Sequence, residues 1–281
     1  MQGRTDLAVE AVSTVEGIRA ATMREGDVEW YDVTVDKSLS HRIGKPSGRY
    51  VTASFPPLTD NEQQLESVAV TLGGKLRELL PRKGTVLVVG LGNEALTADA
   101  LGPRTASMVL ATRHIRGEFA RSVGLDDLRA TAVLYPNVLG NTGMESEEIV
   151  AGVCQQVHPC AVIAVDALAA RSVSRLGCTV QLCDSGIAPG SGVGNNRRAL
   201  SRDTLGIPVI GLGVPTMVDA ERMAEELTGS RCRSGAGGTP MMVTPREIDL
   251  LISRAARLLA MSIHAALQPQ YSPLELLMLA L

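Results

Sequence analysis

Two kinds of apolar pattern alternate along most of the chain. Unbroken runs rich in Val, Ile and Ala are typical of strands buried on both faces, whereas apolar residues three or four positions apart are typical of helices with one buried face. Strands are expected at residues 85–89, 130–135, 161–165, 179–183 and 208–213. Because helical segments separate most of them, the pattern predicts an α/β fold, a doubly wound, mostly parallel sheet with helices on both faces.

The helices are marked by their apolar spacing and, in two cases, by their first residues. The acidic residues of Glu145–Glu148 suit the first turn of a helix that Pro159 ends. Thr244 and Glu247 form a capping box, with Pro245 at the first helical position. Helices are expected within residues 1–27 and at residues 59–80, 99–110, 145–158, 171–175 and 244–259.

The first part of the chain adds a different element. Apolar and polar residues alternate over 28–35, residues 49–55 are rich in strand-forming types, and Lys45–Gly48 forms a loop between them. This pattern predicts a β-hairpin, residues 28–55, appended to the main sheet. No shift of composition marks a second domain, so residues 1–281 are expected to form a single domain.

Composition narrows the classes of function. The 281 residues carry a net charge of −3 and only 2% aromatic residues, which argues against direct nucleic-acid binding. The N-terminus has no apolar signal region, and no segment has the roughly 18 uninterrupted apolar residues of a membrane span, so a cytoplasmic location is expected. The five cysteines lack CxxC spacing, which argues against a disulfide framework or a zinc site. No cofactor is expected.

Two aspartates follow strands in the same way. The strand at 85–89 leads through the turn Gly90–Asn93 to Asp99, and the strand at 161–165 leads directly to Asp166. Both residues have an ordinary interpretation as helix N-caps. The carboxyl ends of parallel strands share one crevice, however, and two carboxylates there can act as an acid and base pair that activates water. Spacing alone leaves these interpretations equally weighted.

Other chemistries have weaker support. Gly90–Ala95 fits G-x-G-x-x-A, but the expected acidic residue at the end of a second strand is missing, so nucleotide binding is not favoured. Ser185 and Ser191 lie outside any nucleophile elbow. His114 is able to join Asp99 and Asp166 as a metal ligand, although a histidine at the end of a helix is the commoner interpretation.

A glycine-rich loop and several arginines are candidates for binding substrate. The loop at 186–198 contains Gly190, Ser191 and Gly192, and its backbone N–H groups are suited to hold a peptide or an oxyanion. Arginines near the predicted crevice are suited to acidic side chains of a substrate, although each has an alternative role as a surface charge. They are Arg104, Arg171, Arg197 and Arg198.

A set of motifs, in order from near the N-terminus to residue 268, resembles the germination protease family of spore-forming bacteria. The motifs that carry the resemblance are Arg4–Glu10, Gly48–Thr52, Val88–Asn93, Asp99–Pro103, Thr112–His114, Thr142–Gly143, Asp166–Arg171, Asp184–Ile187, Pro189–Asn195, Leu205–Val209, Val214–Thr216 and Val243–Pro245.

The resemblance implies a function, a site and a life cycle. It implies an endopeptidase of the atypical aspartic type that begins the degradation of small acid-soluble spore proteins during germination, with catalytic aspartates at Asp99 and Asp166. It also implies a zymogen that cuts itself between Asp6 and Leu7, so that residues 1–6 are a pro-segment. Homotetramers in the cytoplasm of the forespore and in the spore core are further implications.

Two alternatives remain at this point. The turn Gly90–Asn93 and the aspartate after it also resemble the hydrogenase maturation proteases, which suggests a metal-directed processing peptidase. A spore protein-binding module that sequesters its acid-soluble partners without cutting them is the alternative that is not an enzyme.

Overall fold

The structure is a computed structural model, and it describes residues 5–13, 15, 20–60, 64–115, 117–122, 124–191, 197–229 and 241–281. The first four residues of the expected pro-segment lie outside the described residues. So do Gly192 and much of the predicted helix within 1–27, of which α1 (Ala8–Val12) is described.

A nine-stranded sheet forms the centre of the molecule, in the order β1-β2-β3-β7-β8-β6-β4-β5, with β9 paired to β8. The pairs β5–β4, β4–β6 and β6–β8 are parallel, and the other described pairs are antiparallel, so the sheet is mixed. The strands are β1 Ala21–Glu25, β2 Val28–Val35, β3 Gly48–Ser54, β4 Val86–Gly90, β5 Thr131–Leu134, β6 Ala161–Ala170, β7 Thr179–Cys183, β8 Val209–Asp219 and β9 Met242–Val243.

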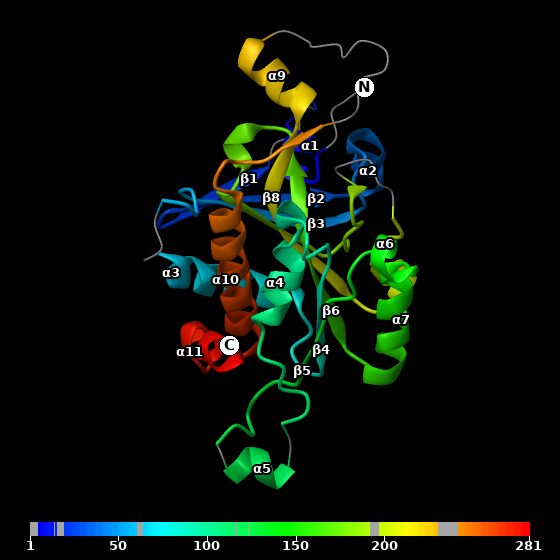
Figure 1. Cartoon of the computed structure of the whole chain (residues 1–281), viewed down its shortest axis with the longest axis vertical. Helices are drawn as coiled ribbons and strands as arrows, with labels where there is room; N and C mark the ends of the chain where they lie inside the picture. The colour runs from blue at the N-terminus through cyan, green and yellow to red at the C-terminus, as the bar shows by residue number, and fades with distance from the viewer. Residues whose placement is uncertain are drawn as a thin grey trace.

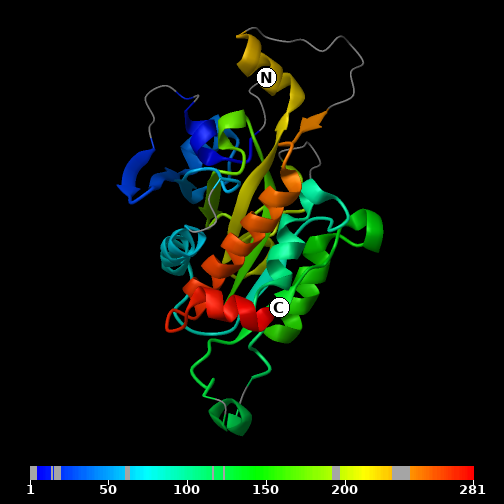
Figure 2. The ribbon, with the colours of Figure 1, turned by 60° about the vertical axis from the view of Figure 1, so that its left-hand side comes forward.

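Helices cover both faces of this sheet (Figures 1 and 2). Along β6, Ile163 and Val165 pack with α3, α4 and α10, whereas Val162 and Ala164 pack on the opposite side with α7 and α8. The helices of the first face are α3 Leu65–Leu79, α4 Leu101–Ser107, α10 Ile248–Leu267 and α11 Pro273–Ala280; those of the second are α1, α2 Lys37–Ile43, α7 Ser146–Val157 and α8 Arg202–Leu205. Strands apolar on both sides require this double cover, so the predicted α/β class with helices on both faces is confirmed. The sheet is less parallel than predicted, because five of the eight described strand pairs are antiparallel.

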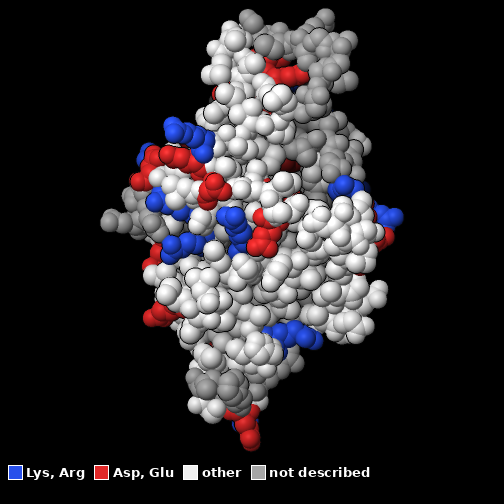
Figure 3. All heavy atoms as spheres, in the orientation of Figure 1, with Lys and Arg blue, Asp and Glu red and all other residues white. Residues whose placement is uncertain are grey.

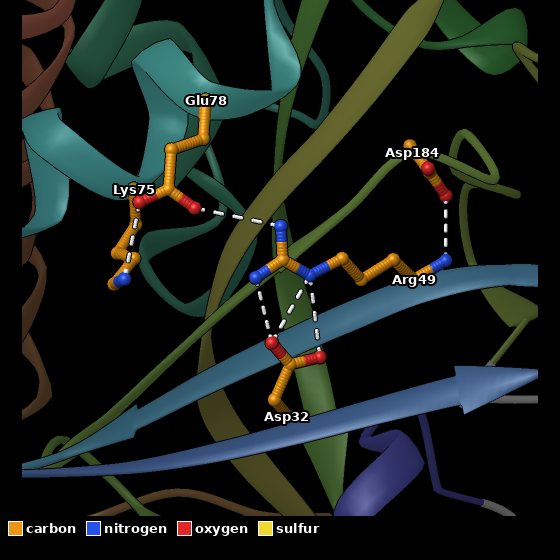
Figure 4. A network of polar contacts seen from close by, with 5 residues as sticks. All are labelled: Asp32, Arg49, Lys75, Glu78 and Asp184. Atoms are coloured by element: carbon orange, nitrogen blue, oxygen red, sulfur yellow. Dashed lines mark hydrogen bonds and ion pairs between the residues drawn. The ribbon is translucent and has the colours of Figure 1, made fainter. Parts of the chain in front are cut away.

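The predicted β-hairpin is also confirmed, with two additions. Strands β2 and β3 pair antiparallel, and α2 occupies the connection that the sequence suggests is a plain loop. Strand β1 extends the hairpin on its outer side. Figure 4 shows how Arg49 of β3 joins this unit to the rest: its guanidinium donates to Asp32 of β2, 2.7 Å away, and reaches Glu78 of α3.

Several predicted boundaries are wrong. Helix α10 begins at Ile248, and its N-cap residue Glu247 makes no side-chain cap, so the capping box predicted at Thr244 does not form. Residues 171–175 contain only a 3₁₀ turn, η2 (Val173–Arg175), because β6 continues to Ala170. The short helices α5 Gly117–Ser122 and α6 Leu139–Thr142 and the helix α9 Ala220–Thr228 complete the described elements.

Helix α10 is long and apolar enough to cross a membrane, but 78% of its most apolar window is buried inside the protein. It packs against α3 and α4 in the main core, which accounts for its composition.

On the face shown in Figure 3, the described surface is largely uncharged, and its basic and acidic groups are interspersed. This face therefore lacks the continuous basic patch of a nucleic-acid binding surface.

Candidate active site

Asp99 is held by a tight turn after β4. Gly92 has φ of +116°, and a Cβ atom there would lie 2.1 Å from the carbonyl oxygen of Asp99, so this close approach requires glycine. The N–H of Asn93 donates to Oδ2 of Asp99 at 2.7 Å. Asp99 ends a 3₁₀ turn, η1 (Thr97–Asp99), and α4 begins later with Ala100 as an N-cap that has no side-chain bond. The predicted helix over 99–110 is thus shorter, and Asp99 does not cap it.

Asp166 lies inside β6 and not at its end. The predicted end at residue 165 is wrong because β8 offers backbone partners as far as Val218, so β6 continues to Ala170. The N–H of Ala167 donates to Oδ1 of Asp166 at 2.9 Å. Asp166 therefore caps no helix either, and local backbone capping explains neither aspartate.

The two carboxyl groups influence each other. Asp166 is only 5% exposed, and burial raises its pKa well above the ordinary value, with the negative charges of Asp99 and then Asp6 raising it further. Burial also raises the pKa of Asp99, while the Asn93 N–H partly offsets this. Of the two, Asp166 retains its proton to higher pH, and Asp99 is the one that ionises first. A protonated and an ionised carboxyl that influence each other are suited to general acid and base chemistry.

A cavity of about 1130 Å³ opens beside Asp166, on the face of the sheet opposite α10. Asp166, Gly213 and Gln181 form one row across β6, β8 and β7. Gly213 has no side chain, and a Cβ atom there would lie 2.5 Å from the carbonyl oxygen of Asp166. The Cγ atom of Leu168 would lie 2.7 Å from the same Cβ atom, so the backbone of β6 and the Leu168 side chain fill the space over the middle of the row.

The N-terminal segment forms part of the wall of this cavity, through Thr5, Asp6 and Ala11. The N–H of Asp6 donates to the carbonyl of Ala169 at 2.8 Å, and the N–H of Ala169 donates to Oδ2 of Asp6 at 2.8 Å. Ser191 donates to Oδ1 of Asp6 at 2.7 Å. The next residue, Leu7, is completely buried and packs with Leu168. The bond that the resemblance marks for self-cleavage thus lies against Leu168 and Ala169 of β6, and the charge of Asp6 acts on Asp166 further along the same strand.

Sequence reasoning missed three residues around this segment. Gln181 donates to the carbonyl oxygen of Asp6 at 2.9 Å, and Lys45 donates to the carbonyl oxygen of Thr5. Burial lowers the pKa of Lys45, whereas the charge of Asp6 raises it. Glu10 accepts from the N–H of Arg171 at 2.8 Å. Gln181 carried a signal, an amide inside the apolar run 179–183, but nothing near Lys45 in the chain indicates its place.

The other predicted binding residues have varied positions. Arg171 lines the cavity, and its guanidinium donates to the carbonyl oxygen of Glu10. Arg197 lies 3.7 Å from Glu145 in an ion pair, and Arg104 lies on α4; neither is part of the cavity lining. Gly190 precedes the lining residue Ser191 and has φ of +70°. Their roles, with those of Asp6 and Leu7, stay predictions.

Metal ligation by His114 has no geometric support. His114 is exposed on the connection between α4 and β5, and within the described ranges no three His, Cys, Asp or Glu side chains form a group suited to a metal ion.

Comparison with known proteins decides the family. The sequence profile described as germination protease matches residues 2–228. The chain belongs to the germination protease family. A relative from Caldanaerobacter subterraneus subsp. tengcongensis, named germination protease, is 38% identical over 97% of this chain and 96% of its own length. One from Priestia megaterium is 42% identical over 77% of this chain and 64% of its own.

Family membership confirms the predicted activity. The protein is an endopeptidase of spore germination, and neither the metal-directed processing peptidase nor the binding module is favoured. A crystal structure of the [NiFe] hydrogenase maturation protease HycI from Thermococcus kodakarensis is similar with a TM-score of 0.38 and 18% identity, over 67% of this chain and 98% of that protein.

Proposed function

We propose that Asp99 and Asp166 hydrolyse a peptide bond of a chain lying where residues 5–8 lie now. Ionised Asp99 accepts a proton from water, whose oxygen attacks the carbonyl carbon of the residue before the cut. Protonated Asp166 donates its proton to the leaving amide nitrogen as the C–N bond breaks. The observations that carry the proposal are the unequal raising of the two pKa values and the peptide segment held against β6 in the wall of a cavity that Asp166 lines and Asp99 does not.

The same segment supports self-processing. Cleavage between Asp6 and Leu7 removes residues that form part of the cavity wall, which makes the unprocessed chain a zymogen. Because Asp6 contacts Ser191 and the backbone of Ala169, its departure frees these donors for an acidic side chain of another protein. Lys45 adds a positive charge, and the negative charge of Asp6 raises the pKa of the Lys45 ammonium group. The site is therefore suited to substrates with an acidic residue followed by a large apolar one.

We assign the small acid-soluble spore proteins as substrates, in the forespore and spore core, and a homotetramer as the assembled state. Both assignments rest on the family resemblance, and no membrane or nucleic-acid partner is proposed. Sedimentation of the unprocessed and processed chains tests the tetramer directly. A monomer at micromolar concentration contradicts it.

The central experiment is incubation of the processed protein with a purified small acid-soluble spore protein, with product masses measured over time. We expect cuts after acidic residues, unaffected by a chelator. Intact substrate, when Leu7 is already the N-terminus, contradicts the proposal. Cleavage that is lost on chelation favours a metal-directed peptidase instead.

Lys45→Gln tests recognition of the acidic residue. The change removes the charge and preserves most of the side-chain length, so KM for a peptide with Asp before the cut should rise about tenfold, while a peptide with Asn there should be affected less. Equal effects on the two peptides contradict a charge-based role of Lys45.

A further inference from the structure

Gln181 contacts the peptide bond that follows Asp6 from the side opposite β6. Its Nε2 group donates to the carbonyl oxygen of Asp6 at 2.9 Å, and its Oε1 atom accepts from the N–H of Ala8 at 2.7 Å. The residue is 6% exposed, so both bonds lie out of bulk water. One amide side chain thus bonds both sides of the Asp6–Leu7 linkage.

The partners determine the orientation of this amide. The backbone N–H of Ala8 can only donate, so it requires Oε1, and the NH₂ group is then directed at the Asp6 carbonyl, which can only accept. If the amide were flipped, its NH₂ group would face the N–H of Ala8 and its Oε1 atom would face the carbonyl oxygen of Asp6, so neither pair would form a hydrogen bond. The donor at the carbonyl oxygen is therefore assigned by chemistry as well as by distance.

The sheet holds Gln181 in place. Strand β7 is paired on both sides, with Gln181 opposite Thr52 of β3 and Gly213 of β8. Asp166 is the next residue of the same row, on β6. Strands two apart are separated by about 10 Å, so Asp166 and Gln181 stand apart in this row, and the Leu168 side chain lies over Gly213 between them.

We propose that Gln181 is a catalytic residue that stabilises the oxyanion formed on the carbonyl of the residue before the cut. This inference rests on the proposed function, because it takes the Asp6–Leu7 bond as the bond broken. As water attacks, the C=O electron pair moves to oxygen and the Nε2–H of Gln181 bonds to that charge without transferring its proton. The pair returns when the C–N bond breaks, with the proton transfers at Asp99 and Asp166 as above.

The energetic reason is the position of the donor. A hydrogen bond aimed at developing charge in a buried site strengthens in the transition state and needs no reorganisation, so it lowers the barrier more than it tightens binding. The contact of Oε1 with Ala8 has the opposite character: it positions the chain and does not change as charge develops. We therefore expect separable effects from the two atoms of this side chain: Nε2 lowers the barrier, and Oε1 positions the chain.

The test is the first-order rate at which the full-length chain acquires Leu7 as its N-terminus, followed by mass spectrometry. Removing one oxyanion donor should slow this rate about 100-fold in Gln181→Met. Gln181→Glu keeps the acceptor for Ala8 and loses the donor when ionised, so its rate relative to wild type should rise as the pH is lowered and the new carboxyl becomes a donor. Thr179→Val, on the same strand and face, should cut itself at the wild-type rate.

The outcomes separate the two proposals. Should the wild-type chain cut neither itself nor a spore protein, the proposed function fails and the role of Gln181 fails with it. If the wild type cuts and folded Gln181→Met cuts within threefold of it, only the role of Gln181 is overturned. Where Gln181→Met does not fold, as judged by thermal unfolding, a Gln181→Glu rate that is reduced equally at every pH overturns it.

Discussion

The two aspartates occupy regions of different construction. Asp99 sits on a turn that glycine makes possible, is partly exposed, and receives a backbone N–H from Asn93. Asp166 sits inside a continuous strand, is 5% exposed, and among the described residues receives the N–H of Ala167 alone. The turn tolerates a negative charge, whereas the strand interior resists one. In the proposed mechanism, these two identical side chains have different tasks, a base on the turn and an acid on the strand.

Removing the base should have the largest effect. Asp99→Asn keeps the size of the side chain but cannot accept the proton of water, so self-cleavage should slow by about 10³ to 10⁴-fold. The rate of appearance of the Leu7 N-terminus measures this. A variant that retains a tenth of the wild-type rate with an unchanged unfolding temperature would refute the role of Asp99.

Removing the acid should cost less. Asp166→Asn keeps the size of the side chain and loses the transferable proton, so we expect about a 100-fold slower reaction. The raised pKa of Asp166 means that stability falls as pH rises through the ordinary carboxyl range, since the unfolded chain releases its proton first. Asp166→Asn should therefore unfold at a higher temperature than wild type at pH 7. A lower temperature contradicts the burial argument.

The pH profile sharpens the comparison further. Activity should rise as Asp99 loses its proton, above the ordinary value of 3.8, and fall again as Asp166 loses its own at higher pH. Asp166→Asn should retain the rise of activity at acidic pH and lose the fall of activity at alkaline pH. If the fall at alkaline pH persists in that variant, another group must be responsible for it.

A histidine far along α10 provides a pH effect of another origin. His264 is buried, its Nε2 accepts from the N–H of Leu110 at 3.0 Å, and burial lowers its pKa from 6.5 to about 4. The unfolded chain takes up the proton first as pH falls, so stability should decline between pH 6.5 and 4, by about 3 kcal/mol in total. Denaturant unfolding at both ends of this range measures the loss, which His264→Gln should largely abolish.

The smallest expected effect tests the turn itself. Gly92→Ala places a Cβ where φ is +116° and the carbonyl of Asp99 lies 2.1 Å away, so it should cost about 1–3 kcal/mol of stability and displace Asp99. Gly74→Ala, in α3 with open space around its Cβ, is the matched control and should stabilise by up to about 1 kcal/mol. Equal unfolding midpoints in the two variants would show that the turn does not require glycine.

The sequence by itself determined the parts that neighbouring residues encode. The apolar runs of 85–89 and 179–183 lie close to the strands observed, and the alternation of 28–35 belongs to β2 of the predicted hairpin. The sequence also indicated that Asp99 and Asp166 share one crevice, and in the structure the charge of Asp99 acts on Asp166. These inferences need only periods of two and of 3.6 residues, which are local properties.

Only the tertiary structure decided where the strands stop and what lies over them. Strand β6 continues past Asp166 because β8, far along the chain, offers it a partner. The bond between Asp6 and Ala169 joins residues 163 positions apart, and Gln181 reaches Asp6 from a third segment. No local pattern specifies such contacts, because they depend on the shapes that packed segments leave between them.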